Sequence, residues 1–180
     1  MTIAANSDSV ILVDDKDVAI GTAEKLDAHR RGLRHRAVSV LVRNSAGEML
    51  LQRRAAGKYH SGGLWANACC SHPVPGENTA AAARRRLREE MGIDCALEPL
   101  FVTHYRAEVS HGLVEDELVH AFGGRHDGSP KPDPAEVSEW TWAAFDEITA
   151  DLRARPDSYA VWFRFYLAEH GTLIAKWLAN

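Results

Sequence analysis

The sequence predicts an α/β (α+β) fold in which helices cover a mixed central sheet. Strand-like segments stand both before and after a charged amphipathic helix at residues 79–91. Two further helical segments, 145–155 and 159–178, end the sequence. Such an order of elements is typical of a sheet packed between helices.

Size and composition suit one domain. The 180 residues are 46% apolar, which is enough for a substantial core. We expect a single domain over 1–180, with an N-terminal extension over about 1–35 and C-terminal helices over about 145–180.

The net charge and the cysteine count limit the partners and the compartment that we expect. A net charge of -4 argues against nucleic acid, and no window is long and apolar enough for a membrane span. The start MTIAANSDSV lacks the order of a signal peptide, and an odd cysteine count gives no disulfide framework. We therefore expect a cytoplasmic protein, a monomer or weak dimer, with reduced thiols.

The segments before the central helix read as strands joined by turns. Residues 9–21 suggest two short strands about an Asp-Asp-Lys-Asp turn, and 24–31 a short helix or loop. The runs 37–43 and 48–54 flank Asn44–Gly47, whose turn chemistry predicts a hairpin. A glycine-containing loop at 55–63 leads to Trp65.

The central helix is predicted from Thr79 to Met91, ending at Gly92. It has an apolar stripe, and Arg86 and Glu90 lie one turn apart beside that stripe. Cys70-Ser71-His72 precedes the helix and is expected to form a tight loop. A solvated helix face with i,i+4 ion pairs would explain the same charges.

The segments after the helix place two carboxylates on one strand face. Strand-like pieces span 96–109, a strand spans 113–122, a loop 123–134, and a final strand 138–142. Alternation puts Glu115 and Glu117 on the same side as Val119. Carboxylates on an apolar strand are costly unless a positive partner meets them.

Metal-ligand residue types recur along the chain. Three imidazoles and the two strand carboxylates would suit zinc or manganese, and these candidate ligands are His29, His35, His72, Glu115 and Glu117. A single histidine is more often a surface or core residue than a metal ligand, and spacing alone does not show that these segments converge. Glu89 and Glu90 are a second candidate, for Mg²⁺, with an ordinary exposed helix face as the alternative.

Cys70 admits two interpretations. A free cysteine is commonly a small buried apolar residue. Its polar neighbours Ser71 and His72 instead favour a thiol that exchanges protons near a metal or basic groups.

The spacing around the helix resembles the Nudix box. The matching residues are Ser71, Glu77, Arg85, Leu87, Glu89, Glu90, Gly92 and Ile93. Ser71 stands where the box has its first Gly, and Arg86 stands where it has a Glu. That Glu belongs to the metal-binding carboxylates of the hydrolases, so a cation there argues against phosphoanhydride hydrolysis.

One branch of that superfamily has such departures. The chain is similar to the type I isopentenyl-diphosphate delta-isomerases in GTAEKLDAH, HRAVS, LLQRRA, W-x-N-x-x-C-x-H-P, RRLREEMG, YRA and VEDE, and in the region of residues 159–162. The resemblance covers most of the chain and implies a Nudix-type α/β/α sandwich with a mixed sheet.

The resemblance also implies roles for particular residues. One zinc or manganese ion would be held by His29, His35, His72, Glu115 and Glu117. Mg²⁺ would be held by Glu90 and the backbone carbonyl of Cys70, against the diphosphate of the substrate. The diphosphate would meet Lys25, Arg54, Lys58 and Arg86, and Trp162 would line the cavity. Cys70 and Glu117 would transfer protons, with Tyr105 assisting near Glu117.

Two details depart from the family pattern. The gap between His29 and His35 is short, which makes His29 the less secure of the two ligands. Cys69 is an extra thiol, and we assign it to packing because Cys70 keeps the Cys-x-His spacing.

The implied reaction interconverts isopentenyl and dimethylallyl diphosphate, feeding isoprenoid biosynthesis. It adds a proton to an unactivated alkene and removes another, so it needs two proton-transfer groups on opposite sides of the substrate. Two alternatives remain: a Nudix diphosphohydrolase, and a non-catalytic metal-dependent module that binds diphosphate.

Overall fold

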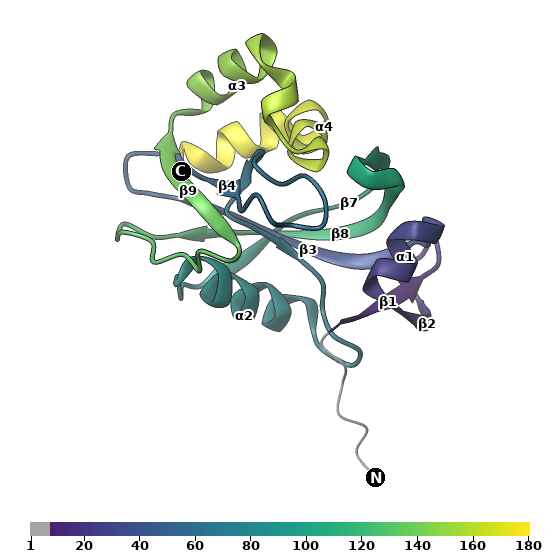
Figure 1. Cartoon of the computed structure of the whole chain (residues 1–180). Coiled ribbons are helices and arrows are strands. Elements are labelled where there is room, and N and C mark those ends of the chain that lie inside the picture. Colours follow the sequence, from purple (N-terminus) through teal and green to yellow (C-terminus); the bar gives the residue numbers. More distant parts are fainter. Residues whose placement is uncertain (1–7) are drawn as a thin grey trace.

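A mixed sheet forms the middle of the molecule, with helices on both faces (Figure 1). The computed structural model describes residues 8–180, and within them nine strands form this sheet. The strands are β1 Ser9–Val13, β2 Ala19–Glu24, β3 His35–Arg43, β4 Met49–Arg54, β5 Trp65–Asn67, β6 Cys69–Ser71, β7 Leu97–Val109, β8 Leu113–Arg125 and β9 Val137–Ala143. The helices are α1 Lys25–Arg31, α2 Thr79–Met91, α3 Phe145–Ala154 and α4 Val161–Leu178, with short 3₁₀ turns η1 Ser110–Gly112 and η2 Pro156–Ser158.

Strand β3 is the centre of the sheet. It pairs in parallel with β8 along its whole length, from His35 opposite Glu117 to Arg43 opposite Arg125. β7 continues the sheet antiparallel to β8, while β1 and β2 extend it on the other side of β3. β4 carries β5 and β9 as antiparallel neighbours.

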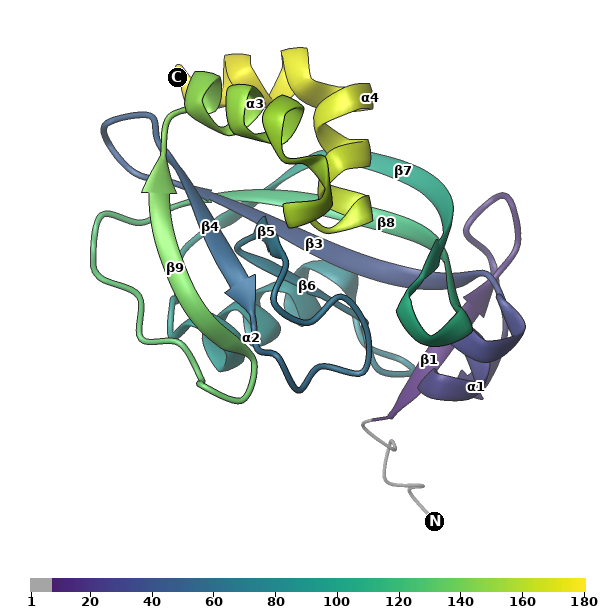
Figure 2. The same cartoon turned by 45° about the horizontal axis from the view of Figure 1, so that its top comes forward.

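The hairpin predicted from 37–43 and 48–54 is wrong except at its turn. β3 and β4 pair only where Arg43 faces Met49, and beyond that point they separate. Residues 38–40 of β3 pair instead with β6, and β4 pairs with β5 (Figure 2). The turn forms as predicted, with the Asn44 side chain accepting from the N–H groups of Ala46 and Glu48, but distant segments compete for the backbone groups of both strands.

The tight loop expected at Cys70-Ser71-His72 is also wrong. Cys69–Ser71 is strand β6, with Ser39 of β3 opposite Cys70. Neighbouring side chains in a strand point to opposite faces. Cys69 accordingly lies in the core beside α2, and Cys70 packs toward the core beside α4.

The two faces of the sheet bury separate apolar cores. Val38, Val40 and Val42 of β3 pack with α2, whereas Ala37 and Leu41 face the core that includes α4. The alternation along β3 therefore produces the α/β/α layers that Figure 1 shows. The predicted fold class is confirmed.

Helix α2 begins and ends where the sequence predicted. The Asn78 side chain accepts hydrogen bonds from the N–H groups of Ala80 and Ala81, which caps the first turn. Gly92 ends the helix at φ 65°, and a Cβ there would lie 2.6 Å from the Lys131 carbonyl oxygen. Only glycine fits both the left-handed backbone and this close approach.

The remaining elements lie close to their predicted positions. β8 continues to Arg125, so the loop expected at 123–134 starts later, and α4 begins at Val161 rather than at residue 159. The expectation that the start MTIAANSDSV is not a signal peptide falls mostly on residues 1–7, which lie outside the described residues. Within residues 8–180, none of the helices has the length and apolarity needed to cross a membrane.

Candidate active site

One face of the sheet presents a row of polar side chains beneath α4. Tyr105 of β7 stands opposite Glu117 of β8, and Glu117 stands opposite His35 of β3. Glu115 lies two residues before Glu117 and therefore on the same face. The row is buried, with Glu115 3% and Glu117 6% exposed.

His29 reaches this row from α1, in spite of the short spacing to His35. Gly32 ends α1 in the left-handed region at φ 58°, and the chain turns directly into β3. The two imidazole centroids lie 4.8 Å apart, and both side chains are fully buried. The short gap therefore brings His29 to the other candidate ligands.

The imidazoles of His29 and His35 direct lone pairs into the cluster. His29 Nδ1 lies 2.7 Å from the Lys25 carbonyl oxygen, and His35 Nδ1 lies 2.8 Å from that of Leu33. A carbonyl only accepts, so each Nδ1 carries the proton and each neutral ring leaves Nε2 unprotonated. His29 Nε2 is buried without a hydrogen-bond partner.

Lone pairs therefore face carboxylate oxygens. His35 Nε2 lies 3.5 Å from a Glu117 oxygen, and His29 Nε2 lies 3.6 Å from a Glu115 oxygen. His72 Nε2 lies 2.8 Å from Glu117 Oε1 and 3.2 Å from His35 Nε2, so the one proton that it can carry serves the carboxylate and leaves His35 Nε2 without a donor. Acceptors at these distances repel unless extra protons or a cation lie among them. A divalent ion would satisfy all of them at once, so the donor set fits the metal that the family resemblance implies.

The two carboxylates are held in the charged form. Tyr105 Oη donates to Glu117 Oε2 at 2.8 Å and also contacts Glu115. Burial and the neighbouring Glu115 would raise the pKa of Glu117, but hydrogen bonds with His35 and His72 outweigh them and lower it to about 2. Two buried negative charges side by side are the electrostatic counterpart of a cation site.

The loop between β4 and β5 adds two residues that the sequence analysis missed. His60 is 3% exposed, and its Nε2 lies 2.7 Å from a Glu115 oxygen. Tyr59 packs edge-on against His29 and His60 and lies under the Lys25 ammonium. With His29 and Glu115, His60 forms a second group of potential ligands. The only sequence signal for Tyr59 and His60 is that they directly follow Lys58, a residue already expected in the site.

The Cys70 thiol lies in a small hydrogen-bond network. Its Sγ is 3.2 Å from Asn67 Oδ1 and 3.2 Å from Ser39 Oγ. The Asn67 amide group donates to Ser39 Oγ at 2.9 Å, so the Ser39 hydroxyl can donate to the sulfur while the thiol donates to Asn67. Burial raises the pKa of Cys70 to about 12, so the thiol is protonated at neutral pH.

Four cations converge on the same pocket from three different regions of the chain. Lys25 comes from α1, Arg54 and Lys58 from the end of β4 and the following loop, and Arg86 from α2. Arg54 stacks on the Trp162 ring at 5.0 Å from its centroid. Burial lowers the pKa of Lys25, and the nearby Lys58 and Arg86 lower it further. The pocket therefore attracts anions at this end.

The two residues that depart from the Nudix box contact each other. Arg86 Nε donates to Ser71 Oγ at 2.9 Å, a bond that glycine could not accept through a side chain. Arg86 Nη2 donates to Glu90 at 2.7 Å, and Glu90 is 4% exposed. Burial raises the pKa of Glu90, although Arg86 opposes the shift.

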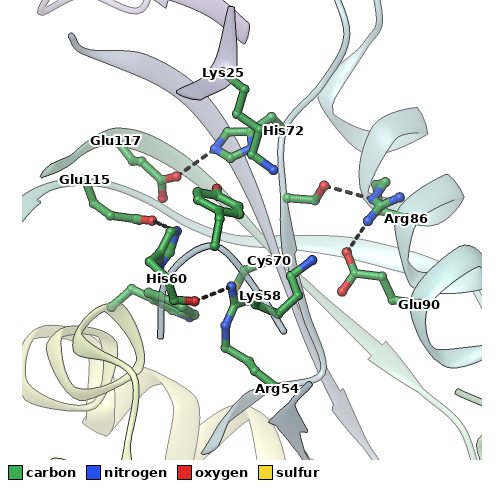
Figure 3. A pocket seen from close by; sticks show the side chains of 13 residues that line it. Lys25, Arg54, Lys58, His60, Cys70, His72, Arg86, Glu90, Glu115 and Glu117 are labelled. Carbon is green, nitrogen blue, oxygen red and sulfur yellow. Dashed lines mark hydrogen bonds and ion pairs between the residues drawn. The ribbon is translucent and has the colours of Figure 1, made fainter. Parts of the chain in front are cut away.

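Most of the predicted site residues line this one pocket. Its lining includes Lys25, Arg54, Lys58, Cys70, His72, Arg86, Glu90, Glu115, Glu117 and Trp162. Figure 3 shows Glu115 and Glu117 on one side, Arg86 and Glu90 on the other, and Cys70 between them. His29, His35 and Tyr105 are buried behind the carboxylates, which they contact. The structure thus brings together the residues to which the family resemblance assigns a role, whereas Glu89, the other candidate Mg²⁺ ligand on α2, lies outside this pocket and pairs with Arg85 and Arg86.

Comparisons with known proteins place this geometry in a family. Residues 33–165 match the family described as the NUDIX domain. The structure resembles DR0079 of Deinococcus radiodurans with a TM-score of 0.68 at 21% identity, covering 81% of this chain and 89% of that one. It resembles a MutT protein of Methanosarcina mazei with a TM-score of 0.61 at 20% identity, covering 81% and 93%. At these identities the similarity establishes the fold alone.

Sequence relatives identify the branch. Isopentenyl-diphosphate Delta-isomerase 2 of Aromatoleum aromaticum is 54% identical over 86% of this chain and 82% of its own length. The isopentenyl-diphosphate Delta-isomerase of Pectobacterium atrosepticum is 48% identical over 88% of this chain and 89% of its own length. The chain therefore belongs to the isopentenyl-diphosphate Delta-isomerase family of Nudix proteins.

Proposed function

We propose that this protein is an isomerase that interconverts isopentenyl diphosphate and dimethylallyl diphosphate for isoprenoid biosynthesis. The observation that carries the proposal is one pocket in which a protonated thiol and buried carboxylates lie beside a group of cations. Chains about half identical to this one over most of their length bear the name of that activity. The protein acts by transferring protons, so atoms and charges of the diphosphate are unchanged.

The protonation states of Cys70 and Glu117 suit a reversible 1,3-allylic shift. Cys70 holds a proton at neutral pH, whereas Glu117 does not, because their pKa values lie far apart, near 12 and 2. One group adds a proton to the alkene and the other removes a proton from a nearby carbon, so the pair ends with the same total. Tyr105 holds Glu117 in place by donating to it.

Two metal ions belong to this proposal. Zinc or manganese would be held by His29, His35, His72, Glu115 and Glu117. Mg²⁺ would be held by Glu90 and the Cys70 carbonyl. The first ion would fix the charge state of the carboxylates, and Mg²⁺ would neutralise phosphate oxygens.

The cations anchor the substrate at its diphosphate end. Lys25, Lys58 and Arg86 present N–H groups to the pocket, and charge-assisted bonds to phosphate would place the alkene near Cys70. Trp162 would face the positive charge that develops on carbon, which stabilises it by about 0.5–2 kcal/mol. The buried position of the site excludes water that would otherwise trap this cation as an alcohol.

The diphosphohydrolase alternative is less well supported. Arg86 occupies the box position where a hydrolase has a metal-binding carboxylate, and its guanidinium is bonded to Ser71 and Glu90. A cation there binds phosphate but does not hold a metal ion for hydrolysis.

The direct test is to incubate the protein with isopentenyl diphosphate, Mg²⁺ and either Zn²⁺ or Mn²⁺, and to follow dimethylallyl diphosphate by NMR. We expect conversion to an equilibrium mixture without phosphate release. Robust phosphate release from nucleoside diphosphate derivatives, without isomerisation, would support the hydrolase instead.

Two cysteine variants separate catalysis from binding. Cys70→Ala should abolish isomerisation while pyrophosphate binding persists, because the thiol transfers a proton and does not carry the anion site. Cys95→Ala is the matched control, because its thiol packs beside Leu97 and Gly124 and lies outside the lining of the pocket. Full activity in Cys70→Ala would contradict the role of the thiol, and a wild-type protein that binds but never isomerises would indicate the binding module.

The cytoplasmic location, the single-domain organisation and the monomeric or weakly dimeric state expected from the sequence stay predictions.

A further inference from the structure

Glu136 lies among the cations of the pocket, although the sequence analysis gave it no role. It directly precedes β9, and its carboxylate pairs with Lys58 Nζ through one oxygen and lies 3.5 Å from Arg86 Nη2 through the other. The same residue lines a second pocket, which adjoins the first and shares Lys25, Lys58 and Arg86 with it. Its side chain is 24% exposed, so it stands at the entrance rather than in the core.

The backbone around Glu136 is fixed to the loop that carries Lys58. The Ala55 N–H donates to the Glu136 carbonyl oxygen at 2.9 Å, and the Glu136 N–H donates to Asp133 at 3.0 Å. The loop and the start of β9 therefore hold each other, while the partly exposed carboxylate can move by side-chain rotation alone.

The charges favour an ionised Glu136. Burial by itself would raise the pKa of this carboxylate, but Lys58 and Arg86 outweigh it and lower the pKa below its ordinary value. Without a bound anion, Glu136 thus neutralises Lys58, while the closer partners of Arg86 are Glu89 and Glu90, each at 2.7 Å.

We propose that Glu136 is an internal counter-anion, which holds Lys58 beside Arg86 in the substrate-free protein and gives Lys58 up to the diphosphate when substrate binds. Carboxylate and phosphate oxygens accept from the same N–H groups, so both cannot use Lys58 fully at once. The inference rests on the proposed function, in which these cations anchor the diphosphate. It predicts that Glu136 sets the affinity for substrate without taking part in proton transfer.

Glu139 provides a matched control on β9, the strand that Glu136 directly precedes. It lies three residues after Glu136 and pairs with Arg53, and both side chains are about half exposed. Glu139→Gln removes the same charge as Glu136→Gln, but outside the lining of both pockets. A general effect of net charge on anion binding would appear in both variants, and an effect of competition only in Glu136→Gln.

The experiment measures binding of inorganic pyrophosphate with Mg²⁺ by calorimetry, so that it does not depend on turnover. We expect Glu136→Gln to bind roughly tenfold tighter than wild type, and Glu139→Gln to bind like wild type. Lys58→Met should bind more weakly. With isopentenyl diphosphate, Glu136→Gln should lower KM without raising kcat, because only the ground-state competition is removed.

Other outcomes identify which inference fails. If Lys58→Met loses pyrophosphate affinity but Glu136→Gln binds equally or more weakly than wild type, Glu136 is not a competitor and the counter-anion role is wrong. If Lys58→Met binds pyrophosphate like wild type, the assignment of this pocket to diphosphate is wrong. Glu136→Ala serves as a second variant, and a weaker binding in both would also overturn the counter-anion role.

Discussion

At the scale of single residues, hydrogen-bond partners decide what the Cys70 thiol can do. A cysteine as buried as this one is ordinarily inert packing. Here Asn67 accepts from the thiol and Ser39 donates to it, so the sulfur has a defined proton position at the pocket wall. The same Asn67 amide also donates to the Val40 carbonyl oxygen at 2.8 Å, which fixes the network to β3.

The Ser39 hydroxyl is therefore expected to tune the thiol. Ser39→Ala removes the group that donates to Cys70 and stabilises its thiolate, so kcat should fall by roughly tenfold while KM changes little. Steady-state kinetics with isopentenyl diphosphate would measure both constants. Ser138→Ala is the control, because Ser138 is an exposed residue of β9 whose hydroxyl donates to the Arg53 carbonyl oxygen of β4. An unchanged kcat in Ser39→Ala would show that the hydroxyl plays no part in proton transfer.

His60 should position Glu115 in the metal site. The Ser61 hydroxyl lies 3.0 Å from His60 Nδ1 and can donate to it, which leaves the Nε2 proton for Glu115. His60→Ala should weaken binding of Zn²⁺ or Mn²⁺ by roughly 10- to 100-fold. His60→Gln, which keeps a donor, should recover most of this affinity. Competition with a chelating dye would measure the affinity without reference to turnover.

A surface histidine serves as the control for that measurement. His120 lies on β8 away from the cluster and bonds Asp17 in the turn between β1 and β2, so His120→Ala should leave metal affinity unchanged. If His60→Gln lost as much affinity as His60→Ala, the imidazole would bind the ion directly and the positioning role would be rejected.

At the scale of elements, α2 combines two functions on consecutive residues. Arg85 holds Glu77 through two hydrogen bonds of 2.7 and 2.8 Å, and Glu77 in turn accepts from the Val74 N–H at 3.0 Å. These Nudix-box residues therefore fasten the loop before the helix. Arg86, one residue along, faces the pocket instead.

We call the hydrogen bonds that join Glu77 to Arg85 and to the Val74 N–H the Glu77 clasp. This clasp should make the stability of α2 depend on pH. Hydrogen bonds from Arg85 lower the pKa of Glu77 in the folded protein. Its contribution is therefore complete above the unfolded pKa of about 4.3 and is lost as pH falls through the lower folded pKa. Glu77→Gln should reduce the free energy of unfolding by about 1–3 kcal/mol at pH 7, and this difference should shrink below about pH 4.

Urea unfolding of wild type and variant at several pH values would measure this difference. Glu169→Gln, at an exposed position on α4, should cost little at any pH. A difference between wild type and Glu77→Gln that stayed constant down to pH 3 would mean that the charge of Glu77 does not stabilise the clasp.

At the scale of the whole molecule, local patterns predicted the elements better than their partners. Helix α2 followed from its apolar period and from Gly92, and Glu115 and Glu117 were placed on one face by alternation alone. The β3–β4 hairpin failed because strand pairing is a competition among all segments, which turn chemistry between two of them does not decide.

Convergence of the site depends on the same long-range pairing. His35 faces Glu117 only because β3 and β8 pair in parallel. The two residues are 82 positions apart in the sequence, and the spacing of residues along the chain does not determine this register. The family resemblance predicted which residues form the site, but it did not predict His60 or Glu136, because neither lies in the motifs that match the family. Those two emerged from contacts with Glu115 and Lys58.

The metal cluster should also contribute to the stability of the fold. Its candidate ligands come from α1, the start of β3, the residue after β6, and β8, so an ion bound there would join segments that separate on unfolding. An ion at 100 times its dissociation constant stabilises the folded state by about 2.7 kcal/mol. For a chain of this size, removing it should lower Tm by roughly 5–10 °C.

Calorimetry with a chelator, followed by Zn²⁺ or Mn²⁺, would measure the loss of Tm and its recovery. The double variant His72→Ala with Glu117→Gln lacks two candidate ligands and should no longer respond to either addition. A wild-type Tm that the chelator leaves unchanged would mean that the buried carboxylates are balanced by protons on the imidazoles rather than by a metal ion.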